Sequence, residues 1–80
     1  MTQFSNDLIH EFPAQAALLT LLKTSNAAFH GLCERYQSHN KLIHKIESGL
    51  EAASDERLED LKKQRLVMLD AIAHDLATAS

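Results

Sequence analysis

The sequence predicts an all-α protein: an antiparallel helical hairpin of coiled-coil-like character with a short N-terminal helical segment, completed by self-association. The first observation behind this prediction is a stripe of side chains at alternating spacings of three and four residues, which is typical of a helix packed against another helix. This stripe comprises Phe29, Leu32, Tyr36, His39, Ile43, Ile46 and Leu50. The second is a similar stripe further along, in Leu58, Leu61, Arg65, Met68 and Ile72. The third is that only two glycines and one proline occur, so little of the chain resembles a linker.

Residues 5–24 form the predicted N-terminal helical segment. Ser5 is placed to cap a short helical turn, and Pro13 suits the first turn of the helix that follows. Because so short a helix is marginal in isolation, the segment must dock on the long helices of the same chain or on those of a second copy. The sequence leaves open whether this segment is continuous with the next helix.

The first long helix is predicted over residues 26–49, with Ser25 or Asn26 as its N-cap. Gly49 is placed for the left-handed residue that ends many helices, with Leu50 folding back onto the last turn. After a short connection, Ser54 opens the second long helix, predicted over residues 54–77.

A short connection makes two long amphipathic helices antiparallel neighbours. Pairing positions about the turn places Ile43 opposite Leu61, and it places His39 opposite Arg65. The two positions that interrupt the apolar stripes therefore share one layer. We predict a polar layer midway along the hairpin, of the kind that fixes helix register at some cost in stability.

Eighty residues allow a single domain, 1–80, with a core near the lower limit of self-sufficiency. Cys33 is the only cysteine, so no disulfide can form within the chain. A lone thiol suits a reducing cytoplasm. Cys33 is interpreted either as a reactive thiol or, the reading we adopt, as a small residue beside the helix stripe.

The chain carries a formal net charge of -3, and it therefore has no general basic field for nucleic acid or anionic lipid. No Lys or Arg precedes Lys23, which is unlike a signal peptide. The most apolar run, residues 16–22, is far shorter than the ~20 residues of a membrane span. We expect a cytoplasmic protein, with membrane-surface binding by residues 8–22 as an alternative.

No pattern of side chains indicates chemistry. The five histidines lack the i, i+3 or i+4 spacing of a helical metal site. There is no glycine-rich phosphate loop and no recognisable nucleophile–base arrangement. We expect no metal, no cofactor and no enzymatic activity.

The charged run from Asp55 to Arg65 is read as a solvated, salt-bridged helix face or as a docking patch. Within it, Lys62, Lys63 and Arg65 support an alternative function as a nucleic-acid-associated regulator.

Some apolar side chains flank the hairpin stripes instead of filling them, leucines of the N-terminal segment add further apolar area, and a two-helix hairpin alone cannot cover these surfaces. They form the predicted interaction surface, which comprises Leu18, Leu22, Leu42, Leu66 and Ala73. We predict a protein–protein interaction or oligomerisation module, which forms a homo-oligomer (a dimer or a four-helix assembly) and offers a surface to a further protein partner.

The segment from Leu22 to Ile72 resembles the YdcH-like small bacterial proteins, whose function is unknown. The similarity is carried by a set of matching positions: Phe29, Tyr36, His39, Asn40, Ile46, Glu47, Asp55, Glu56, Leu61, Lys62, Lys63 and Leu66. The sequence departs from the family pattern at Leu69–Asp70–Ala71, where a more charged run is usual. The resemblance implies a bacterial, helical, self-associating protein, and it implies no activity.

Overall fold

A computed structural model describes residues 4–79 of the chain. The elements are α1 (Phe4–Glu11), a short 3-10 helix η1 (Pro13–Gln15), α2 (Ala16–Ser25), α3 (Ala27–Glu47) and α4 (Asp55–Ala79). Every regular element within these residues is a helix, which confirms the all-α prediction. The side chain of Ser5, the predicted first cap, lies outside the described part of the structure.

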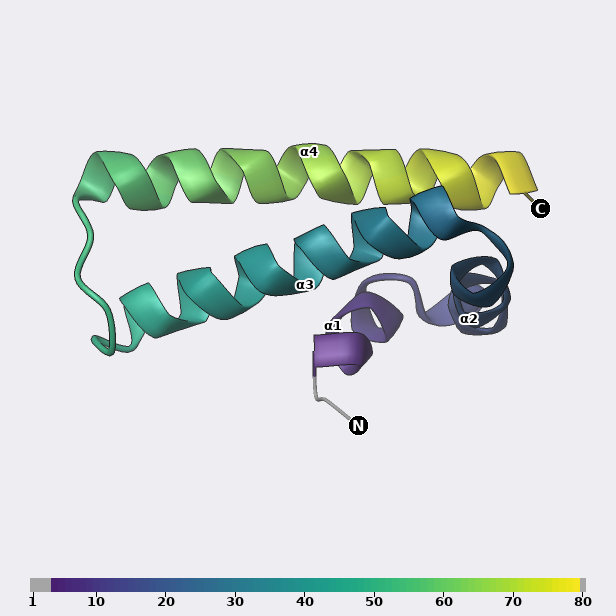
Figure 1. Ribbon diagram of the computed structural model, residues 1–80, viewed down its shortest axis with the longest axis horizontal. Coiled ribbons are helices and arrows are strands. Elements are labelled where there is room, and N and C mark those ends of the chain that lie inside the picture. Colours follow the sequence, from purple (N-terminus) through teal and green to yellow (C-terminus); the bar gives the residue numbers. More distant parts are fainter. Residues whose placement is uncertain (1–3, 80) are drawn as a thin grey trace.

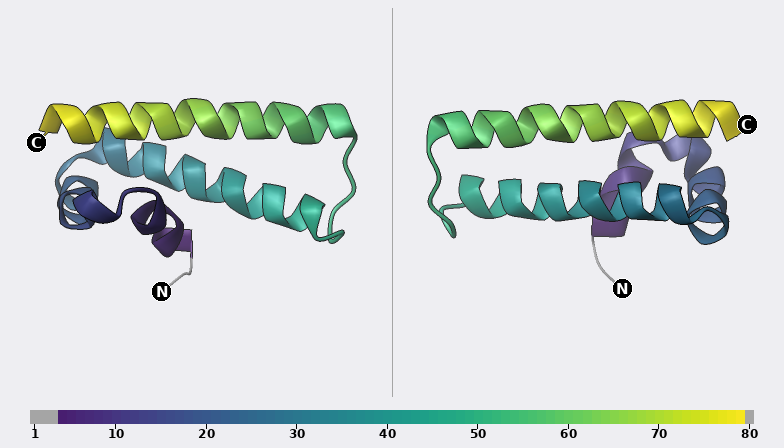
Figure 2. Two further views of the ribbon diagram at one scale, coloured as in Figure 1. Left: turned by 180° about the vertical axis from the view of Figure 1, so that it is seen from behind. Right: turned by 45° about the horizontal axis from the view of Figure 1, so that its top comes forward.

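The two long helices, α3 and α4, lie side by side and run in opposite directions (Figure 1). The N-terminal elements α1 and α2 pack against α3 near the end where α3 begins (Figure 2). Of the two alternatives for the N-terminal segment, docking on its own chain or on a second copy, the structure shows docking on the long helices of its own chain.

The chain changes direction at Asn26, where α2 and α3 meet. Asn26 is extended, with φ -134° and ψ 108°, and its side chain accepts a hydrogen bond from the backbone N–H of Phe29. The Oδ1–N distance is 3.1 Å, which is the geometry of a helix N-cap. Figure 1 shows α2 nearly end-on while α3 runs across the view, so the two helices are not continuous.

The turn between α3 and α4 follows local signals in the sequence. Gly49 has a φ of +83°, the left-handed conformation that glycine adopts without a steric cost. The Oγ of Ser54 accepts a hydrogen bond from the N–H of Arg57 at 3.0 Å and so caps α4. The expectation that Leu50 folds back onto α3 is wrong, because this side chain is 80% exposed. Only its backbone N–H returns, to the carbonyl of Lys45 at 2.9 Å.

The main core lies where the N-terminal segment meets both long helices. Its buried members come from α1, α2, α3 and α4 and comprise Leu8, Leu19, Phe29, Cys33, Tyr36, Ile72 and Leu76. Leu8 is completely buried and Leu19 is 2% exposed. These two leucines attach α1 and α2 to the long helices, since a buried leucine contributes about 1.5–3 kcal/mol.

Within α3, the buried side chains follow a line slightly different from the predicted stripe. They are Phe29, Cys33, Tyr36, Asn40 and Ile43, again at spacings of four and three, and of these Tyr36 and Asn40 retain a slight exposure. The predicted members Leu32, His39 and Ile46 are half-buried beside this line. The buried face of α3 is thus turned toward Cys33 and Asn40.

Replacing Asn26 by alanine should lower the free energy of unfolding by about 1 kcal/mol, because the first turn of α3 loses its cap. Ser25→Ala is the matched control, since the Ser25 hydroxyl donates to the Leu21 carbonyl within α2 and caps nothing in α3. Urea denaturation of both variants measures the difference. Equal losses in the two variants would contradict the assignment of Asn26 as the cap.

Cys33 is a second testable feature of the core. It is completely buried, and burial raises the pKa of its thiol from 9.0 to about 11. Because the folded state holds the proton more tightly than the unfolded state, this stabilisation is complete below pH 9 and is lost as the pH rises through about 11. The reading of Cys33 as a packed small residue, not a reactive thiol, agrees with this environment.

We expect a thiol reagent at neutral pH to modify Cys33 only as fast as the protein opens, and to react readily once the chain is unfolded in urea. Above pH 9, wild type should lose stability more steeply than Cys33→Ala, which has no thiol to ionise. Rapid modification of the folded protein would show that the thiol is accessible.

Candidate functional site

A polar layer crosses the interface between α3 and α4 midway along their length. The Nη1 of Arg65 donates a hydrogen bond to the Oδ1 of Asn40 at 2.8 Å. Asn40 is only 7% exposed and is the buried polar residue of the described chain. Arg65 is half-buried. A buried amide held by a charged donor favours one helix register over its neighbours.

His39 lies in the same part of the interface but makes a different hydrogen bond. Its Nε2 donates to the Oε1 of Gln64 at 2.9 Å, and the Nε2 of Gln64 donates to the Oδ2 of Asp60 at 2.8 Å. The sequence predicted that His39 and Arg65 would share one layer. The structure instead places Arg65 against Asn40, one residue further along α3, and it places His39 on the exposed edge of the layer.

Charged groups also join the two helices near the turn. The Nζ of Lys62 lies 2.8 Å from the Oε2 of Glu47. The hydrogen bond from Lys62 and its positive charge lower the pKa of the Glu47 carboxyl, and the charges of Arg65 and His44 add to this effect. Since the pair is exposed, it contributes little to stability.

A groove follows each side of α4. On the side next to α1 it is lined by polar and apolar side chains of three helices, including His10, His44, Lys62 and Leu66. On the other side α3 and α4 form an open groove with a mostly apolar lining, which includes Met68 and the exposed Val67.

The residues of the predicted interaction surface occupy different environments. Leu18 and Leu22 are half-buried and pack against the main core. Leu42 and Ala73 are also half-buried. Leu66 is 59% exposed, and it is the member of this set that faces solvent. The chain's own N-terminal segment therefore covers part of the surface that was expected to need a partner.

The predicted interaction surface did not include Val67, although its side chain is 67% exposed. Val67 does not belong to the predicted stripe of α4 that runs from Leu58 to Ile72, which we call the inner stripe. The apolar spacing of that stripe therefore did not select it. A second three- and four-residue spacing, on the outer face of the same helix, is the sequence signal that would have identified Val67.

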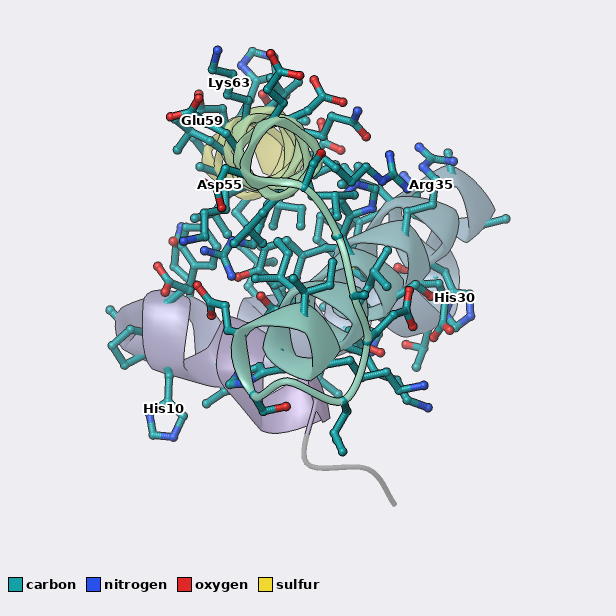
Figure 3. All side chains as sticks on the ribbon, turned by 90° about the vertical axis from the view of Figure 1, so that its left-hand side faces the viewer. His10, His30, Arg35, Asp55, Glu59 and Lys63 are labelled. Carbon is teal, nitrogen blue, oxygen red and sulfur yellow. The ribbon has the colours of Figure 1, made fainter. Side chains whose placement is uncertain are left out.

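Lys62, Lys63 and Arg65 do not form one basic patch. Lys62 is directed to Glu47 on α3, and Arg65 is directed to Asn40 in the interface. Lys63 lies on the side of α4 that is turned away from α3 (Figure 3). Lys62 and Arg65 line the same groove, and Lys63 lies apart from them.

The histidines are dispersed over the surface. His10 and His30 lie on opposite sides of the molecule (Figure 3), and His30 is 3.8 Å from Glu34. Within residues 4–79 no three His, Cys, Asp or Glu side chains gather as metal ligands would. None of the helices in this range combines the length and the apolar character of a membrane span.

Comparison with known proteins identifies a family. The model of a family described as a protein of unknown function, DUF465, matches residues 29–75. This range covers most of α3, the turn and most of α4. The chain belongs to the DUF465 family. This is the family of the YdcH-like proteins, as the sequence resemblance implied. No curated protein and no solved structure matches the chain.

The polar layer of this DUF465 protein can be tested by substitution. Arg65→Leu should lower the free energy of unfolding by about 1–3 kcal/mol, because the buried amide oxygen of Asn40 loses its donor from Arg65. Combining it with Asn40→Leu should recover the loss, since an apolar layer replaces a polar one. Urea denaturation measures both effects.

His39→Leu is the control, because its hydrogen bond to Gln64 is exposed; we expect a change within about 0.5 kcal/mol. If Arg65→Leu proved as mild as His39→Leu, the bond between Arg65 and Asn40 would not be holding the interface.

Proposed function

We propose that this DUF465 protein is a protein–protein interaction module that works by self-association. Its unit is the antiparallel, coiled-coil-like hairpin of α3 and α4, with register set by the polar layer. Two such hairpins would supply four long helices. The proposal carries no catalytic step and no cofactor.

The observation that supports the proposal is the pair of branched apolar side chains exposed in the middle of α4. Leu66 is 59% exposed and Val67 is 67% exposed, and each borders one of the two grooves beside this helix. Rigid apolar groups on a long helix favour burial by another helix, at about 25 cal/mol per Å² of apolar surface removed from water. A second hairpin laid against the outer face of α4 would cover Val67.

We place the protein in the cytoplasm as part of the same proposal. Cys33 is a lone, buried thiol with no disulfide partner in its chain, which suits a reducing compartment.

Sedimentation over a concentration series extending to millimolar should show the mass rising from the 8.9 kDa monomer toward twice that value. Val67→Glu should shift the equilibrium toward the monomer, because a charge would then lie where apolar surface is buried. Circular dichroism should remain that of the wild type, since the side chain at this position is exposed in the monomer.

Leu21→Glu is the matched control: Leu21 is 62% exposed, but it lies on α2, away from the outer face of α4. A wild-type protein that stays monomeric throughout the series would overturn the proposal.

A further inference from the structure

The outer face of α4 carries a second stripe at spacings of three and four, which consists of Asp60, Lys63, Val67, Asp70 and His74. All five are exposed, so they follow the helix on the side opposite its buried face. Figure 3 shows Lys63 on this outward side. We call these five residues the outer stripe.

The charges of the outer stripe are arranged with opposite signs on the two sides of Val67. Lys63 lies one helical turn before Val67, and Asp70 lies one turn after it. Asp60 and His74 lie two turns before and two turns after it. If a second α4 runs in the opposite direction and is centred on Val67, its Asp70 lies next to Lys63 of the first helix. Its His74 then lies next to Asp60 of the first helix.

This arrangement meets the condition for a two-fold interface. In such an interface residue i of one copy contacts residue j of the other, and j contacts i in return. An antiparallel pair centred on Val67 places Lys63 against Asp70 of the second copy twice, and it places Asp60 against His74 of the second copy twice. A parallel pair would instead place Lys63 against Lys63 and Asp70 against Asp70, which is repulsive.

The side chains of the outer stripe are also available for these contacts. Within residues 4–79, no side-chain hydrogen bond or ion pair engages Lys63, Asp70 or His74. Asp60 accepts one hydrogen bond, from Gln64, and its carboxylate has room for others. Lys63 and Asp70 are seven residues apart, about 10.5 Å along the helix axis, so they cannot pair with each other within one chain.

From these observations we infer that the partner of α4 is a second copy of this chain, docked antiparallel on the outer stripe. Val67 packs against Val67 of the second copy at the two-fold axis, and the charged residues pair on both sides of it. The inference rests on the proposed self-association and specifies its geometry. Because one branched apolar residue per copy supplies the centre, the dimer is weak and becomes weaker as salt screens the flanking pairs.

Charge reversal tests this geometry. Lys63→Glu and Asp70→Lys should each weaken self-association by about tenfold or more, since two attractive contacts become repulsive in each dimer. Lys45→Glu, the same change at an exposed position of α3, should leave association unchanged. Sedimentation measures the dissociation constants, and circular dichroism verifies that all three variants remain helical.

The decisive measurement is an equimolar mixture of Lys63→Glu and Asp70→Lys. In the mixed dimer the glutamate introduced at position 63 faces the lysine introduced at position 70, and the other contact retains its wild-type pair. The mixture should associate about as tightly as wild type although neither variant does so alone. A folding defect or a lost contact within one chain could not be rescued by mixing.

The outcomes separate the two proposals. A wild-type protein that never dimerises removes the proposed function, and this geometry with it. A wild-type dimer that tolerates both reversals, or a mixture that does not recover, removes the outer stripe as the interface and leaves self-association in place.

Discussion

The fold depends on burial of the N-terminal segment against the end of the hairpin where α3 begins. Two helices share only one line of contact, and they leave the remaining apolar surface of each helix exposed. Leu8 and Leu19 supply a third layer over Phe29, Cys33 and Tyr36 of α3 and over the last turns of α4. This layer requires α2 to leave the direction of α3, and the extended backbone at Asn26 provides the change of direction. An 80-residue chain thereby encloses a core without a disulfide.

The same layer accounts for the difference between the predicted and observed interfaces. Leu32 and Cys33 are neighbours on α3, as are His39 and Asn40, and an apolar stripe can follow either set. Apolar character alone selects Leu32, but α1 and α2 cover the flank that carries Cys33, so the buried face turns that way. Asn40 then enters the interface and receives the hydrogen bond of Arg65. The sequence predicted a polar layer midway along the hairpin. It did not predict which residue of α3 pairs with Arg65, because that depends on how α1 and α2 pack and the spacing of the stripe carries no information about this packing.

The features that could be predicted from sequence are local ones. The cap at Asn26, the left-handed Gly49 and the cap at Ser54 depend on hydrogen bonds or steric freedom within about four residues. Leu50 was misplaced because its position depends on whether the turn presents it to the helices or to solvent. Val67 was missed because the inner stripe accounts for the amphipathic pattern of α4, so its outer face was read as solvated.

The interface between α3 and α4 is linked to the outer stripe by hydrogen bonds. His39 on α3 donates to Gln64, and Gln64 donates to Asp60, which belongs to the outer stripe. The hydrogen bond to the Asp60 carboxylate comes from within α4, and His39 of α3 contacts the same Gln64 side chain. A change of register between α3 and α4 would separate His39 from Gln64 and Arg65 from Asn40, whereas the hydrogen bond from Gln64 to Asp60 lies within α4. One register therefore satisfies both hydrogen bonds across the hairpin, and one of these bonds ends on Gln64, the side chain that donates to Asp60 of the outer stripe.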